Sequence, residues 1–299
     1  SLMGVLVLLL RWIYAPKQWR YLAWAFFVFG LCFTNHQTLI VAAMGIVVAI
    51  AAVDYKMGRN MFLWCSIAYV GGLVLWAQEM IFRDTNPMVF AIFNLVGVSF
   101  VATYILFAVL TRITFLELCR DTALLGCLVF LCATPGMGKS GLGNLSVVLF
   151  LASFAVVIWM GWETRKHGLE WIFVLACGLL WLFGAGFNLY MPLAGMSTPP
   201  MQWGYPRTLE GFIHALTRGQ YEKTNPTDVL SGAGLLRFVS QLGLVGEGIV
   251  AEFNWVYTLI ALIPFLYFFR MQKRERSWMI GLVAIYLCRI NALTEKVGS

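Results

Sequence analysis

The chain has 299 residues, of which 61% are hydrophobic and only 12% are charged, and its mean hydropathy is +0.80. An average soluble domain carries about 25% charged residues, so this composition excludes a soluble globular protein and a disordered chain and predicts an integral membrane protein. The net charge of +7 comes from 21 Lys and Arg spread between apolar runs, which is typical of membrane orientation signals and not of a nucleic-acid interface.

Apolar runs separated by charged or Pro/Gly-rich breaks predict an all-α, polytopic membrane protein with about ten transmembrane segments. The first of these is partial and the last is short. The runs are residues 2–14, 21–34, 38–53, 61–80, 89–111, 122–133, 145–162, 171–196, 253–269 and 279–290.

The first run, residues 2–14, is shorter than the roughly 20 residues that a helix needs to cross a bilayer. No basic stretch precedes it and no small-residue cleavage site follows it, so it does not resemble a signal peptide. Because the chain also starts on Ser, we expect it to be a piece of a longer protein that is cut inside a helix.

Residues 21–53 are either one long tilted helix or two short helices broken at 34–37. The broken form keeps more positive charges on one face, and we favour it. It places Asn35, His36 and Gln37 at the outer face or in a protein-lined cavity beneath it, where polar breaks are tolerated. The alternative for a lone His at the membrane edge, such as His36, is a structural hydrogen-bonding role without a part in a site.

Ten alternating crossings put 13 of the 21 Lys and Arg on one face, with residues 270–276 as the strongest basic loop. The positive-inside rule makes this face cytoplasmic. We expect a bacterial inner membrane, a transmembrane domain at 1–196, an extracytoplasmic loop with a short helix at 197–238, and a last part at 239–299. That part begins with an interfacial helix, predicted by an apolar stripe over 235–253, before the chain enters the membrane at Trp255.

Two further patterns predict no chemistry. The seven cysteines lie in or beside apolar runs without a CxxC pair, so we expect structural cysteines and no metal site. Residues 136–140 end in Gly-Lys-Ser, but a P-loop needs glycine where Ala133 stands, and we expect a flexible outer loop instead.

The long outer loop contains the strongest candidate site. Thr208 is a suitable N-cap, Glu210 suits the first helical turn, and Gly219 ends a helix predicted over 209–218. Gly211, His214 and Arg218 share one face of this helix, and Arg207 precedes it.

Two guanidinium groups and an imidazole around a glycine are the groups that a phosphate prefers. The opposite side offers apolar residues for packing onto the membrane domain, namely Leu209, Phe212, Ile213 and Leu216. The alternative is an ordinary amphipathic surface helix with solvated arginines.

Two stretches carry a family resemblance. Residues 198–208 read TPPMQWGYPRT and continue through Gly211-Phe212 to Arg218-Gly-Gln-Tyr221, and residues 30–38 read GLCFTNHQT. Together they closely resemble the signature loop and a second motif of a large family of multi-span bacterial membrane proteins. That family, long catalogued without a function, is placed among GT-C-type glycosyltransferases and is related to animal protein O-mannosyltransferases.

The resemblance implies an enzyme that transfers a sugar from a polyprenyl-phosphate donor to a protein hydroxyl on the extracytoplasmic face, without a cofactor. Its partners would be membrane lipid, the lipid-linked donor and an acceptor protein. The family's general base is a carboxylate in the first outer loop, which has no counterpart here, so the catalytic residue is unknown. The substrate-binding residues it implies are Asn35, His36, Trp203, Gly204, Tyr205, Arg207, His214, Arg218 and Tyr221.

Two other classes stay open. A lipid or sugar transporter, or a flippase, also has many spans, although the spans show no paired charges and no inverted repeat. A non-catalytic membrane scaffold is the third possibility.

Overall fold

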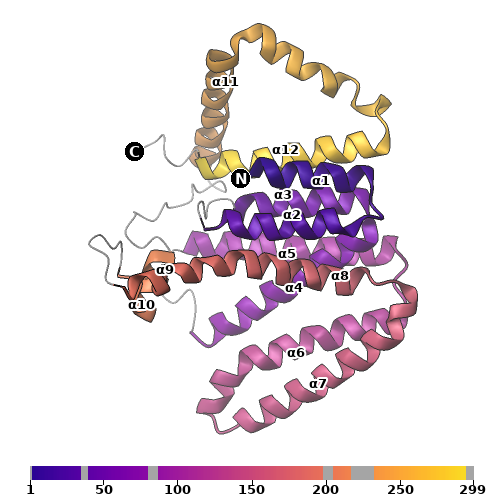
Figure 1. Cartoon of the computed structure of the whole chain (residues 1–299), viewed down its shortest axis with the longest axis vertical. Helices are drawn as coiled ribbons and strands as arrows, with labels where there is room; N and C mark the ends of the chain where they lie inside the picture. The colour runs from indigo at the N-terminus through magenta and orange to yellow at the C-terminus, as the bar shows by residue number, and fades with distance from the viewer. Residues whose placement is uncertain (1, 35–39, 80–86, 198–204, 217–231, 294–299) are drawn as a thin grey trace. The chain divides into compact units, whose positions relative to one another are not determined.

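The computed structural model describes residues 2–34, 40–79, 87–197, 205–216 and 232–293, and every regular element within these ranges is a helix (Figure 1). The chain divides into two compact units. Unit 1 is Ser1–Ala49 with Leu175–Ser299, and unit 2 is Ile50–Val174.

Unit 1 contains helices from both ends of the chain. They are α1 (Leu2–Tyr14), α2 (Trp19–Cys32), most of α3 (Ile40–Val53), most of α8 (Glu170–Ala185), η3 (Gly186–Leu189), α9 (Tyr190–Gly195), α10 (Leu209–Leu216), α11 (Gly232–Leu266), η4 (Phe268–Arg270) and α12 (Lys273–Leu293). Unit 2 contains the ends of α3 and α8 together with α4 (Tyr55–Ala77), α5 (Pro87–Leu110), α6 (Phe115–Lys139), α7 (Gly143–Thr164) and η2 (Arg165–His167).

Five helices of the described chain are long and apolar enough to cross a membrane, which supports an integral membrane protein. They are Tyr55–Ala77, Val89–Leu110, Gly143–Thr164, Glu170–Gly195 and Gly246–Leu266. Three shorter apolar helices accompany them, at Leu2–Tyr14, Trp19–Cys32 and Ala42–Val53. Helices cover most of the described part of every run expected from the sequence, but the count of ten crossings stays a prediction.

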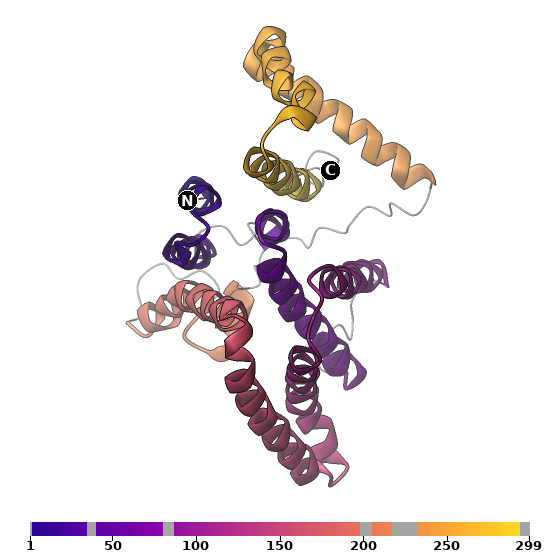
Figure 2. The ribbon, with the colours of Figure 1, turned by 90° about the vertical axis from the view of Figure 1, so that its right-hand side faces the viewer.

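In unit 1, α1 and α2 lie side by side (Figure 2). Two glycines let the backbones of α2 and α8 come into contact. A Cβ on Gly30 of α2 would overlap Trp181 O, and a Cβ on Gly184 of α8 would overlap Phe27 O. Small residues allow this close packing between helices in membranes. The ring of Phe33 then packs edge-on against Trp181 at 5.4 Å between centroids.

The region of 21–53 is two helices, α2 and α3, as we favoured, while residues 35–39 lie outside the described chain. The helix α11 breaks at Asn254, which has φ 65° and ψ 149°. The break falls one residue before Trp255, where we expected the chain to turn into the membrane. The Asn254 side chain accepts a hydrogen bond from Val256 N at 3.4 Å, so it caps the second part of the helix.

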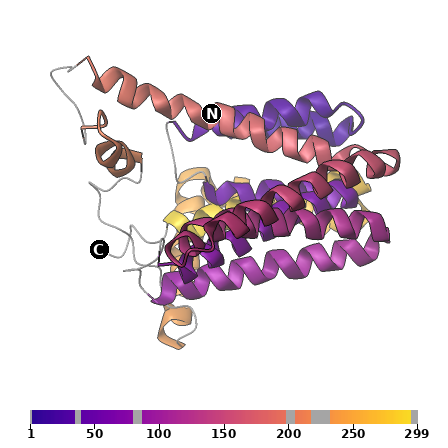
Figure 3. The ribbon, with the colours of Figure 1, turned by 90° about the horizontal axis from the view of Figure 1, so that it is seen from below.

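In unit 2, α6 and α7 form an antiparallel hairpin (Figure 3). The helix α4 packs against both α5 and α6. The expected flexible loop at residues 136–140 is wrong, since α6 stays helical through Lys139 even though it contains Pro135.

Candidate functional site

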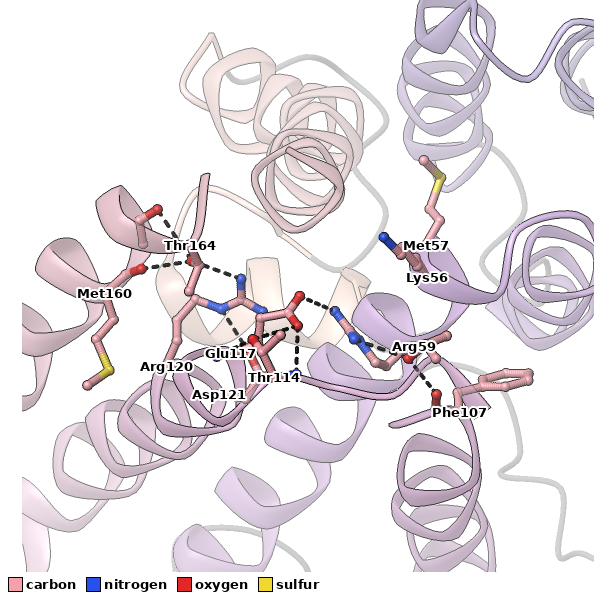
Figure 4. A network of polar contacts seen from close by, with 12 residues as sticks. Lys56, Met57, Arg59, Phe107, Thr114, Glu117, Arg120, Asp121, Met160 and Thr164 are labelled. Atoms are coloured by element: carbon pink, nitrogen blue, oxygen red, sulfur yellow. Dashed lines mark hydrogen bonds and ion pairs between the residues drawn. The ribbon is translucent and has the colours of Figure 1, made fainter. Parts of the chain in front are cut away.

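A cluster of two ion pairs lies at the N-terminal ends of α4 and α6 in unit 2 (Figure 4). In the first pair, Arg59 Nη2 donates to Glu117 Oε1 at 2.9 Å, and the two side chains are only 3% and 14% exposed. Arg59 Nη1 also donates to Thr111 Oγ1 at 3.1 Å, which connects α4 to the turn between α5 and α6. One arginine of α4 therefore holds the start of α6.

The position of Glu117 follows from the local sequence. Thr114 is the N-cap of α6, and its Oγ1 accepts a hydrogen bond from Glu117 N at 3.3 Å. Glu117 Oε2 accepts from Thr114 N at 3.0 Å, which completes a capping box. Burial raises the pKa of Glu117, but the hydrogen bond from the Thr114 backbone and the charge of Arg59 outweigh it and lower that pKa to about 2.

The second ion pair joins four helices. Arg120 Nη2 donates to Asp121 Oδ1 at 2.7 Å, and both side chains are 2% exposed. Arg120 Nη1 donates to Thr164 Oγ1 of α7 at 3.3 Å, and its guanidinium carbon lies 4.9 Å from the ring centroid of Trp171 in α8. Tyr104 of α5 donates through its hydroxyl to Asp121 Oδ2 at 2.8 Å.

The cluster fastens helix ends together, because each of its carboxylates already has a guanidinium partner. Its members are Arg59, Tyr104, Thr111, Thr114, Glu117, Arg120, Asp121 and Thr164, called the ion-pair cluster below. In the described ranges, no three His, Cys, Asp or Glu residues gather to hold a metal ion.

Sequence reasoning missed this cluster, since it counted Arg59 and Arg120 only as orientation signals. Two patterns could have revealed part of it. Thr114 and Glu117 have the spacing of a capping box, and Arg120 and Asp121 are adjacent just before an apolar run. The absence of paired charges in the spans was our argument against a transporter, and the two ion pairs of this cluster weaken that argument.

A second polar arrangement surrounds Pro135 in α6. The side chain of Gln78, at the end of α4, donates through Nε2 to Cys132 O at 2.9 Å and accepts from Gly136 N at 2.6 Å. In an unbroken helix, Gly136 N would bond to Cys132 O directly. The Gln78 amide therefore replaces the backbone hydrogen bond that opens beside the proline.

The predicted outer site is described only in part. Tyr205, Arg207 and His214 are described, and all three are exposed. The other residues expected there lie outside the described residues, namely Asn35, His36, Trp203, Gly204, Arg218 and Tyr221.

Within residues 205–216, called the outer segment below, the predicted helix start is confirmed. Thr208 Oγ1 accepts from Gly211 N at 3.1 Å, as an N-cap does. Arg207 precedes this cap, and a Cβ on Gly195 would lie 3.2 Å from Arg207 N. The segment thus starts against the C-terminal end of α9, and Figure 3 shows α10 near that end.

The conformation of Tyr205 is unusual. Its φ is 47°, in the left-handed region that bulky residues seldom occupy. Its side chain is 66% exposed. A strained backbone that presents an exposed aromatic ring is a feature of ligand-binding sites.

The expected packing of the apolar side of this helix is wrong for two residues. Leu209 is 75% exposed and Ile213 is 49% exposed. A short amphipathic helix next to a membrane span can place such exposed side chains in the lipid interface.

No family model matches the chain, and neither a curated protein nor a solved structure matches it.

Proposed function

We propose that this chain belongs to a GT-C-type membrane glycosyltransferase that transfers a sugar from a polyprenyl-phosphate donor to a protein hydroxyl on the extracytoplasmic face of a bacterial inner membrane. The proposal rests on the resemblance of residues 198–221 and 30–38 to that family. The helical, membrane-spanning architecture is compatible with it.

The observation that carries the proposal is the position of Arg207. The span Glu170–Gly195 has 26 residues and is about 39 Å long at a rise of 1.5 Å per residue. Arg207 lies against its last residue, Gly195, and is exposed. A guanidinium at the end of a span is at the depth where the phosphate of a lipid carrier resides, and it pairs with phosphate oxygens through two hydrogen bonds.

The neighbouring groups suit the same substrate. The N-terminus of α10 begins beside Arg207 and favours negative charge. The exposed Tyr205 ring offers a surface for a sugar ring, and His214 adds a hydrogen-bonding group one and a half turns into α10.

These residues bind and orient the donor and do not activate the acceptor. During transfer the bond between the sugar carbon and the phosphate oxygen breaks, and the carrier leaves as polyprenyl phosphate. Arg207 and Arg218 stabilise the negative charge that stays on this leaving group. The acceptor hydroxyl gives up its proton to a base that we assign to none of the described residues.

The test uses the complete protein in membranes with radiolabelled polyprenyl-phosphate sugars. Because a charge-assisted hydrogen bond is worth about 1.5–3 kcal/mol, Arg207→Ala and Arg218→Ala should each reduce label transfer to protein roughly 10- to 100-fold. Lys139→Ala, which removes an exposed cation elsewhere, is the control and should leave transfer unchanged. Wild-type transfer by the double variant would refute the phosphate-binding role.

A transporter or flippase is the second candidate, and the interrupted helix α6 favours it. Transporters often contain discontinuous helices, and in α6 one backbone hydrogen bond is opened beside Pro135 and replaced by the Gln78 amide. The same labelling experiment separates the classes. Labelled protein supports the transferase, movement of the intact carrier supports the flippase, and the absence of both supports a scaffold.

A further inference from the structure

An apolar pocket of about 670 Å³ lies in unit 1 where the end of α11 meets the first half of α12. Its volume is within the roughly 300–1,000 Å³ of ordinary small-molecule sites. The lining includes Tyr14 of α1, Phe265 of α11, and Trp278 and Leu282 of α12. Glu275 is the one charged residue among the described lining residues, and the others are apolar or aromatic, so most of the wall suits a hydrocarbon chain.

The pocket opens on a surface that a membrane would cover with lipid. No residue in the most apolar 18-residue window of Gly246–Leu266 is buried inside the protein. Large apolar side chains near the pocket are exposed as well, with Leu266 at 81% and Phe269 at 88%. Exposed apolar side chains on a candidate span are in contact with lipid chains in the bilayer.

Basic residues flank Met271 and Glu275, two residues that line this pocket. Residues 270–276, which precede and begin α12, carry four cations and one carboxylate. Arg270, Lys273 and Arg274 are exposed. Arg274 Nη1 donates to Tyr14 O at 3.4 Å, which brings the end of α1 to the same edge.

The single carboxylate of this stretch, Glu275, has a structural role. Its Oε2 accepts a hydrogen bond at 3.1 Å from the backbone N of Gln272, the residue that directly precedes α12. A carboxylate in the first turn that bonds back to the preceding residue is half of a capping box. With four cations and one carboxylate, the stretch still carries a net positive charge next to the pocket.

We propose that this pocket binds one anionic phospholipid of the surrounding bilayer, with an acyl chain along Phe265, Trp278 and Leu282 and the phosphate beside Arg270 and Lys273. Basic pockets between membrane helices recognise anionic head groups because Lys and Arg pair with phosphate. A zwitterionic lipid would bring its own ammonium group toward these cations. The site uses none of the residues assigned to the sugar donor, so it stands apart from the proposed function.

The experiment measures lipid binding to the purified full chain in mild detergent by native mass spectrometry, with phosphatidylglycerol or phosphatidylcholine as the probe. Wild type should bind phosphatidylglycerol at least about tenfold more tightly. Each basic residue near the lipid contributes roughly a fivefold factor in affinity. The double variant Arg270→Gln with Lys273→Gln should therefore bind phosphatidylglycerol about 30-fold more weakly and bind phosphatidylcholine as tightly as wild type does. Arg112→Gln with Lys166→Gln removes two exposed cations of unit 2 and is the matched control.

A second variant tests the apolar part of the site. Val283→Trp fills the pocket that Val283 lines. It should weaken the binding of both lipids, because it blocks the acyl chain without changing the charge. Equal affinity of wild type for the two lipids would overturn the proposal. So would an equal loss of phosphatidylglycerol affinity in the Arg270/Lys273 double variant and in the Arg112/Lys166 control. A lipid-free dimer that dissociates in Val283→Trp would also overturn it and assign the pocket to a second copy of the chain.

Discussion

The ion-pair cluster of unit 2 and the outer segment of unit 1 both contain arginine, but they use it differently. Arg120 is 2% exposed and bonds to a carboxylate and a hydroxyl, whereas Arg207 is exposed beside a glycine. A buried guanidinium with a carboxylate partner connects helices, and an exposed one at the end of a membrane span is accessible to an external anion. The surroundings of each arginine therefore indicate its role.

The largest expected difference between the two regions is in stability. Arg120→Met leaves Asp121 buried without its counter-charge, which costs about 3–5 kcal/mol when one member of a buried pair is removed. Arg207→Met should change stability by less than about 0.5 kcal/mol, since it is an exposed position. Thermal unfolding of both variants in the same detergent measures the contrast. Equal melting temperatures would remove the distinction between the regions.

The next effect concerns the opened backbone of α6. Gln78→Leu leaves Cys132 O and Gly136 N without the amide that now pairs with them, and we expect a loss of about 2–3 kcal/mol. Pro135→Ala should recover much of this loss in the Gln78→Leu background, because a continuous helix can bond these two groups directly. The unfolding free energies of wild type, the two single variants and the double variant form a double-mutant cycle. Strict additivity would show that Gln78 does not replace the helical hydrogen bond.

The smallest effect is a pH dependence within the ion-pair cluster. The pKa of Glu117 is lowered to about 2 in the folded protein, from an ordinary value of 4.5. A lowered pKa stabilises the fold above the ordinary value, and this stabilisation is lost as the pH falls from about 4.5 toward 2.

Glu117→Gln should therefore cost about 1–2 kcal/mol at neutral pH, and the difference from wild type should shrink through that acid range. Melting temperatures between pH 2 and 7 test this. Arg207→Gln is the control, because Arg207 has no carboxylate partner among the described residues, and it should follow the wild-type pH profile. A gap between Glu117→Gln and wild type that stays constant with pH would contradict the prediction.

Some of these features could be predicted from the sequence and others could not. The cap at Thr208 and the break before Trp255 were predictable, because capping and helix breaks depend on residues that are neighbours in the chain. The packing of Leu209 and Ile213 was not predictable, since an apolar stripe does not say whether protein or lipid covers it. The helical course of residues 136–139 was missed because the Gln78 amide that supports it comes from another helix.

By itself, the sequence determined that this is a helical membrane protein, because apolar runs of about 20 residues satisfy their backbone hydrogen bonds within a bilayer only as helices. It also determined that a helix begins after Thr208. Only the tertiary structure decided which charges are paired. Arg59 and Glu117 are 58 positions apart, and a hydrogen bond between distant residues depends on how their helices pack.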